Sequence, residues 1–170
     1  MTNLEYKAKV FATRAHASIG QLRKYTGEPY IVHPAEVVEI VRSRPHTPEM
    51  LAAAWLHDVV EDTGVPIEEI FTLFGTKVGL LVAGLTDVSQ RHQGNREVRK
   101  AIDRAHTAAA SPEAKTIKLA DLISNTRSIA KHDPDFARTY LKEKALLLEV
   151  LKEGDRELWK LANQILEENW

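Results

Sequence analysis

Hydrophobic residues recur along most of the chain at the spacing of amphipathic helices. Leu4, Ala8, Phe11 and Ala15 follow one another at intervals of three or four residues, which places them on one face of a first helix. The same spacing returns in the later segments, and no segment alternates as a half-buried strand does. The pattern predicts an all-α protein, an irregular bundle of about eight to nine helices.

Proline, glycine and short polar residues mark the ends of these helices. A proline suits the first turn of a helix, a Ser, Thr or Asp before it caps the free N–H groups, and a glycine commonly follows the last turn. The polar residues 87–95 are predicted to form a mobile loop. The third helix is expected to run from Pro48 to about Asp62. Starts are predicted at His33-Pro34, Thr47-Pro48, Ser111-Pro112 and Asp133-Pro134, and ends at Gly20, Gly64, Gly75 and Gly154.

Length, charge and the absence of cysteine narrow the classes of function. A chain of 170 residues fits a single domain, residues 1–170. Without cysteine it has no disulfide framework, thiol nucleophile or zinc finger. A net charge of −1 offers no basic surface for nucleic acid, and the apolar runs are far shorter than a membrane span. We expect a cytoplasmic protein with neither a nucleic-acid nor a membrane partner; its oligomeric state stays open.

The segment 57–62 is the richest in groups that can do chemistry. On a helix, His57 lies one turn from Glu61 and Asp58 one turn from Asp62. Carboxylates gathered beside a buried apolar helix repel one another unless a positive charge lies among them. A divalent metal ion would supply that charge. The alternative is a helix end whose acids simply face solvent.

For other His and Asp residues, too, a role as metal ligand has to be compared with an ordinary structural role. His132-Asp133 is a second such pair, but it precedes Pro134, so Asp133 is interpreted as a helix cap. His33 stands at the start of a helix, and Asp121 lies on an apolar helix one turn before Asn125. Taken singly, each is more often a satisfied polar residue than a metal ligand.

Together, His33, His57-Asp58 and Asp121 resemble the metal signature of the HD phosphohydrolases. The fuller strings resemble the hydrolase domain of the RelA/SpoT family in its single-domain form, the small alarmone hydrolases. The resemblance covers roughly residues 4 to 165. The matching segments, in family order, are Arg23-Lys24, Gly27 to Pro34, Leu56 to Thr63, Phe74-Gly75, Leu85 to Asp87, and Lys118 to Asp121 with Asn125 and Arg127.

The resemblance implies a metal-dependent hydrolase with the HD-domain fold. It implies Mn²⁺ held by His33, His57, Asp58 and Asp121, and ligands of this type also suit other divalent ions. The implied reaction removes the 3′-diphosphate of guanosine tetra- or pentaphosphate and yields GDP or GTP plus pyrophosphate. Glu61 and Asp62 resemble the catalytic acidic pair of the family; the alternative is that they only support the metal ligands. Since the chain has no room for a synthetase domain, we expect degradation without synthesis.

The resemblance also implies a nucleotide pocket. The predicted substrate-binding residues are Arg23, Lys24, Asn125, Arg127 and Tyr140, although a solvated surface is the alternative for each charged one. Leu122 and Ser124 stand where the family often has a basic and an aromatic or His residue. An adenine alarmone or NADPH therefore stays open as substrate, and a non-catalytic alarmone-binding module is the alternative from another class.

Overall fold

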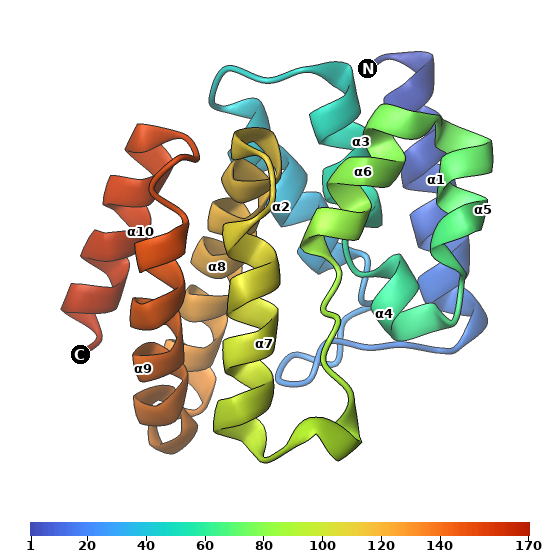
Figure 1. Ribbon diagram of the computed structural model, residues 1–170. Coiled ribbons are helices and arrows are strands. Elements are labelled where there is room, and N and C mark those ends of the chain that lie inside the picture. Colours follow the sequence, from blue (N-terminus) through green and yellow to red (C-terminus); the bar gives the residue numbers. More distant parts are fainter. The chain divides into compact units, whose positions relative to one another are not determined.

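The computed structural model describes residues 1–170 and contains ten α-helices, one 3₁₀ helix and no strand. The predicted all-α class is confirmed. The chain divides into two compact units, Met1–Thr86 and Asp87–Trp170 (Figure 1). One domain over residues 1–170 stays a prediction. None of the helices has both the length and the apolar character needed to cross a membrane.

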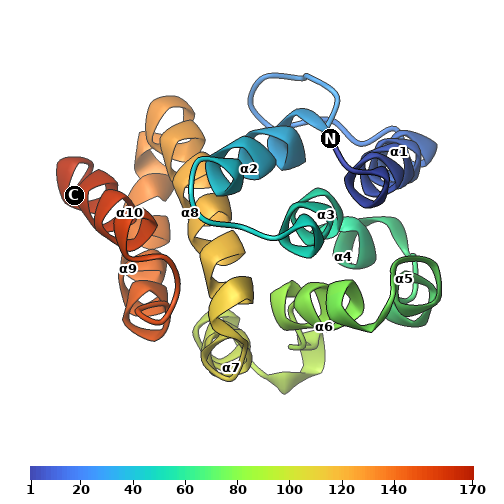
Figure 2. The same cartoon turned by 90° about the horizontal axis from the view of Figure 1, so that it is seen from above.

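In the first unit, helix α3 (Pro48–Leu56) packs against α1, α2 and α6 (Figure 2). Its residues from Met50 to Leu56 are all buried, because their side chains are apolar on every face of the helix. Thr47 caps α3 as predicted, and its hydroxyl accepts a hydrogen bond from the Met50 N–H. The other helices of this unit are α1 (Asn3–Ser18), α2 (Val32–Arg42), α4 (Val59–Thr63), α5 (Ile67–Phe74) and α6 (Thr76–Leu85).

The predicted third helix is wrong at one point. It does not run on to Asp62, because α3 ends at Leu56 and α4 begins at Val59. His57 Nδ1 lies 2.7 Å from the Ala54 carbonyl oxygen, so a side chain competes for an acceptor that a continuing helix would use for its own N–H groups. The Asp62 N–H still donates to the Asp58 carbonyl at 3.0 Å. The expected separation of Asp58 and Asp62 by one turn therefore survives the break.

The predicted face of the first helix is also displaced. Leu4, Phe11 and Ala15 are only half-buried. The fully buried residues of α1 are instead Glu5, Ala8, Ala12 and His16. Glu5 can lie inside because its carboxylate forms an ion pair with Arg42 of α2, which compensates the charge that burial would otherwise leave unpaired.

In the second unit, helix α8 (Pro112–His132) packs against α9 (Pro134–Val150) and α10 (Arg156–Glu168). Both predicted caps are confirmed: Ser111 Oγ accepts from the Ala114 N–H, and Asp133 Oδ1 from the Phe136 N–H, each at 3.2 Å. Residues 87–95 lie outside the α-helices and include a 3₁₀ helix (Arg91–Gln93). The Asp103 carboxylate of α7 (Arg96–Ala108) accepts hydrogen bonds from the Val88 and Ser89 N–H groups, so one end of this loop is held.

The close packing of α5 on α6 generates a prediction for Gly79. A Cβ atom at this position would lie 2.6 Å from Cγ of Phe71. We expect Gly79→Ala to lower the free energy of unfolding by about 1–3 kcal/mol, although alanine favours a helix by roughly 1 kcal/mol over glycine. Urea unfolding measures the change, and Leu80→Ala, at an exposed position of the same helix, is the control. A Gly79→Ala protein as stable as the wild type would contradict this packing.

Candidate metal centre and catalytic carboxylates

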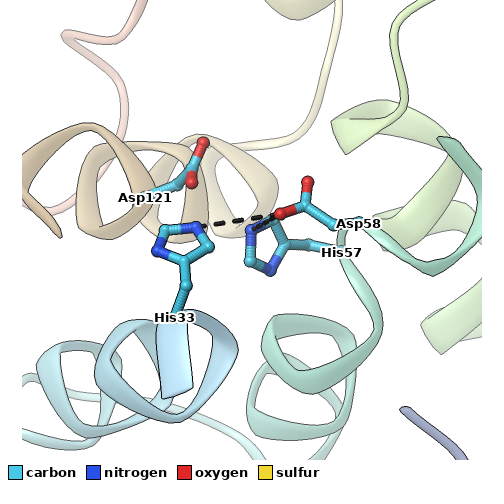
Figure 3. A group of neighbouring side chains, drawn as sticks. All are labelled: His33, His57, Asp58 and Asp121. Carbon is cyan, nitrogen blue, oxygen red and sulfur yellow. Dashed lines mark ion pairs between the residues drawn. The ribbon is translucent and has the colours of Figure 1, made fainter. Parts of the chain in front are cut away.

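His33, His57 and Asp58 point toward one another in the first unit (Figure 3). His33 lies in the first turn of α2, and His57 and Asp58 form the break between α3 and α4. The two imidazoles are buried, whereas the Asp58 side chain keeps 17% of its surface exposed. Asp58 Oδ2 lies 3.1 Å from His57 Nε2 and 3.7 Å from His33 Nε2. These three residues offer ligand atoms within 4.8 Å of one another, which is close enough to share one ion.

The hydrogen bond of His57 to the backbone determines what this group can hold. A carbonyl oxygen only accepts, so the 2.7 Å contact with Ala54 requires a proton on His57 Nδ1. In the neutral ring, Nε2 then carries a lone pair that faces the Asp58 carboxylate. Two such acceptors at 3.1 Å repel unless a cation lies between them. A backbone partner on Nδ1 is the usual arrangement of a metal-binding histidine, and imidazole nitrogens with a carboxylate fit a divalent transition metal.

Tyr30 supports the Asp58 carboxylate through the same oxygen that faces the two histidines. Its hydroxyl donates to Asp58 Oδ2 at 2.5 Å, and its ring lies 5.8 Å from the His33 ring, centroid to centroid. A hydrogen bond donated to a carboxylate stabilises its charged form, and it also fixes the orientation in which the carboxylate can bind a metal ion. Tyr30 belongs to the matched segment Gly27 to Pro34, but sequence reasoning assigned it no role.

Glu61 and Asp62 follow on α4, and both residues are exposed. Asp62 Oδ2 accepts a hydrogen bond from Gln21 Nε2 at 3.1 Å. Partial desolvation of its carboxyl raises the pKa of Asp62 above the ordinary value, and the nearby Asp58 carboxylate raises it further. A carboxylate with a raised pKa is a better proton acceptor, which is what a general base requires.

Asp121 lies on α8 in the second unit and is also labelled in Figure 3. The carboxyl group is buried. Asn125 Nδ2 donates to its Oδ1 at 3.0 Å, and Lys118 Nζ lies 3.4 Å from its Oδ2. The expected one-turn pairing of Asp121 with Asn125 is confirmed.

The predicted substrate residues of the first unit lie in the connection between α1 and α2. Arg23 Nη1 is 3.3 Å from Glu36 Oε2, and only 11% of the Arg23 side chain is exposed. It is therefore not the freely solvated loop residue of the alternative interpretation. Lys24 is exposed, and its ammonium lies 5.3 Å from the Tyr25 ring centroid.

The predicted substrate residues of the second unit differ in exposure. Arg127 is exposed on α8. Tyr140 is buried, its hydroxyl accepts a hydrogen bond from Thr126 at 3.3 Å, and burial raises its pKa. The Lys144 ammonium lies 5.0 Å from the Tyr140 ring centroid, and burial lowers its pKa to about 8. Lys144 and Lys100 also line a small polar cavity of about 60 Å³ in this unit.

Two further residues of the first unit were missed by sequence reasoning, His16 and Gln21. His16 is buried, and its Nδ1 lies 2.8 Å from Gln21 Oε1. The signal in the sequence is the four-residue spacing Ala8, Ala12, His16, which places a histidine on the same stripe as two small apolar residues. A polar residue on a buried stripe is expected to have a hydrogen-bond partner, so this spacing could have indicated a role for His16.

Comparisons with known proteins identify relatives of this chain. A "Probable guanosine-3′,5′-bis(diphosphate) 3′-pyrophosphohydrolase" of Synechocystis sp. is 36% identical over 140 residues, which are 81% of this chain and 18% of the relative. The "Guanosine-3′,5′-bis(diphosphate) 3′-pyrophosphohydrolase MESH1" of Danio rerio is 37% identical over 111 residues, 64% of this chain and 60% of the relative. The chain thus spans less than two thirds of the length of either relative.

Solved structures share the fold. The structure of "a metazoan ortholog of SpoT" that "hydrolyzes ppGpp" superposes with a TM-score of 0.87 at 29% identity, over 99% of this chain and 96% of the other. A structure from Listeria monocytogenes EGD-e superposes with a TM-score of 0.69 at 24% identity, over 85% of this chain and 99% of the other. The family model described as "HD domain" matches residues 8–148. Because this match includes most of the chain and extends into both compact units, the protein belongs to the HD domain family.

Proposed function

We propose that this chain is a metal-dependent pyrophosphohydrolase of guanosine tetra- and pentaphosphate. The reaction cleaves the 3′-diphosphate from the ribose and yields GDP or GTP plus pyrophosphate. The observation that carries the proposal is the group formed by the buried His33 and His57 and the partly exposed Asp58, in which a backbone hydrogen bond leaves the His57 Nε2 lone pair to face a carboxylate. The named activity of the relatives supports the substrate.

The metal of this proposal is Mn²⁺, held by His33, His57, Asp58 and Asp121. Two imidazoles and two carboxylates suit such an ion and leave positions for water and phosphate. When bound, the ion lowers the pKa of a bound water and neutralises phosphate charge. The cytoplasm remains the location expected from the sequence.

We assign the proton transfers to Glu61 and Asp62. They follow the proposed ligands His57 and Asp58 by one turn, and the raised pKa of Asp62 suits a group that accepts a proton from an attacking water. Departure of the diphosphate leaves an oxygen on the ribose that must gain a proton, which the same pair supplies.

Substrate binding is proposed for Arg23, Lys24, Asn125, Arg127 and Tyr140. Arg23 is well suited because Glu36 and its buried stem hold the guanidinium in one orientation, and a planar guanidinium both stacks on a base and pairs with phosphate. Lys24 adds an exposed point charge. Tyr140 is the least accessible of the five, so its contribution is expected through the groups that contact it, Thr126 and Lys144.

The first test is the release of pyrophosphate from guanosine tetraphosphate by metal-free protein, with and without Mn²⁺. We expect release only with the metal, and a faster turnover than with adenine alarmones or NADPH. His57→Ala should lose Mn²⁺ binding in calorimetry, and activity by more than the roughly 100-fold that loss of a supporting residue costs. His132→Ala, from the second His-Asp pair, is the matched control. No release at saturating Mn²⁺ would refute the proposed substrate.

The acidic pair is tested with Glu61→Gln. The change keeps the shape of the side chain and removes its ability to exchange a proton, so we expect Mn²⁺ affinity to stay and kcat to fall about 10²–10⁴-fold. Glu68→Gln, at an exposed position of α5, is the control. Turnover at the wild-type rate would remove Glu61 from the proton transfers.

Asp62 generates a prediction on stability. Its pKa is raised in the folded protein, so its charged form destabilises the fold at neutral pH, and this cost disappears as the pH falls and the carboxyl takes up a proton. We expect Asp62→Asn to raise the Tm of metal-free protein at pH 7 by about 1–3 °C, while it lowers activity. The gain in Tm should shrink toward about pH 4. A gain that grows on acidification would contradict the assigned shift.

A further inference from the structure

His16 is buried in the last turn of α1, in the first unit. Its Nδ1 lies 2.8 Å from Gln21 Oε1, whereas its Nε2 is buried without a hydrogen-bond partner. An apolar side chain of similar size would avoid the cost of burying that nitrogen. The presence of a histidine at this buried position therefore needs an explanation beyond packing.

The first explanation lies in the amide of Gln21. Gln21 Nε2 donates to Asp62 Oδ2 at 3.1 Å, so its carbonyl oxygen faces the opposite way, toward His16. That oxygen only accepts, which requires a proton on His16 Nδ1. If Nδ1 were bare, the amide would have to turn its NH₂ group to His16 and its carbonyl oxygen to Asp62, and two acceptors would repel. The His16 proton thus determines which face of the amide Asp62 meets.

The backbone holds Gln21 in the same place. Its N–H donates to the His16 carbonyl at 3.1 Å, and its own carbonyl accepts from the Tyr30 N–H at 3.0 Å. Gln21 is therefore attached both to the end of α1 and to the segment that leads into α2. Because only the backbone of Gln21 is fixed in this way, the contact with His16 is what orients the amide at the end of its side chain.

The contacts from His16 through Gln21 to Asp62 form a first arm of interactions, and a second arm runs from the His16 ring through Tyr30 to Asp58. The two rings lie 4.7 Å apart, centroid to centroid, at an angle of 48°. The Tyr30 hydroxyl in turn donates to Asp58 Oδ2 at 2.5 Å. One buried ring thus supports two acids that lie one turn apart, Asp62 through an amide and Asp58 through a phenol.

We propose that His16 is a positioning residue, which orients Asp62 through Gln21 and supports Tyr30 against Asp58. The proposal rests on the hydrolase function proposed above, because it assigns Asp62 a task that needs a defined orientation. His16 acts through Gln21 and Tyr30. Loss of its hydrogen bond to Gln21 alone should consequently reduce the rate of the chemical step rather than the binding of nucleotide or metal.

Two substitutions separate the arms. His16→Phe keeps an aromatic ring beside Tyr30 and removes the donor to Gln21, so we expect kcat to fall about 10-fold or more with KM and Mn²⁺ affinity unchanged. His16→Asn places an amide N–H near the position of Nδ1 and should recover much of kcat. Gln21→Leu should reduce kcat as His16→Phe does, and the double variant should lose little more, because both changes break one chain of contacts.

His46→Phe, the same substitution at an exposed histidine of the first unit, is the control, and circular dichroism and Tm establish that each variant folds. A His16→Phe protein with wild-type kcat would overturn the proposal. So would a double variant whose loss is the product of the two single losses, because the residues would then act independently.

A spectroscopic test does not depend on turnover. In ¹⁵N-labelled, metal-free protein, the chemical shifts of the His16 ring nitrogens report which of them carries a proton. We expect the proton on His16 Nδ1. The same proton should be retained in the Glu61→Gln variant, which is the matched control because Glu61 is not part of the contacts from His16 to Asp62. A bare Nδ1 would overturn the positioning role even in an active enzyme. A protonated Nδ1 in a protein that releases no pyrophosphate would refute the proposed substrate and leave the chain of contacts in place.

Discussion

The candidate site depends on the hydrogen bond between His57 Nδ1 and the Ala54 carbonyl oxygen. This bond places the ring proton on Nδ1 and leaves the Nε2 lone pair to face Asp58. The same contact accompanies the end of α3, so Asp58 leaves regular helical geometry with φ −105° and ψ −2°. Its carboxylate can therefore approach both His57 and His33. This local contact thus determines which nitrogen of His57 carries the proton. It also accompanies the break between α3 and α4, where the candidate ligands His33, His57 and Asp58 come together.

This arrangement gathers several carboxylates on one short segment of the chain. Asp58, Glu61 and Asp62 follow His57 within five residues. Partial burial raises the pKa of Asp62, and the Asp58 carboxylate raises it further. A divalent cation reverses the balance, because it attracts all of these groups. Clustered carboxylates lower the stability of the fold at this place. Such local destabilisation, in a chain whose other segments follow the usual helix and capping preferences, is typical of functional sites.

Helix α1 provides the support behind this charge. Ala8 and Ala12 are fully buried, and their small side chains let α1 approach α3 closely. Two polar residues of the same stripe lie toward its ends: Glu5 pairs with Arg42, and His16 bonds to Gln21. Glu5 and His16 thus each have one partner on a following segment of the chain, and these contacts connect α1 to the residues that lie next to the acids.

The sequence by itself determined the helical class, the caps at Ser111 and Asp133, and the candidate ligands, since these follow from local spacing and from residue types matched to a known signature. The helix break at His57 and the buried stripe of α1 could not be predicted from local spacing. A helix continuing to Asp62 and a face through Leu4 both satisfy local periodicity, and only contacts distant along the chain decide between such alternatives. Tertiary structure brought Tyr30 to Asp58 and Gln21 to Asp62, because hydrogen bonds between residues 28 and 41 positions apart depend on how the helices pack.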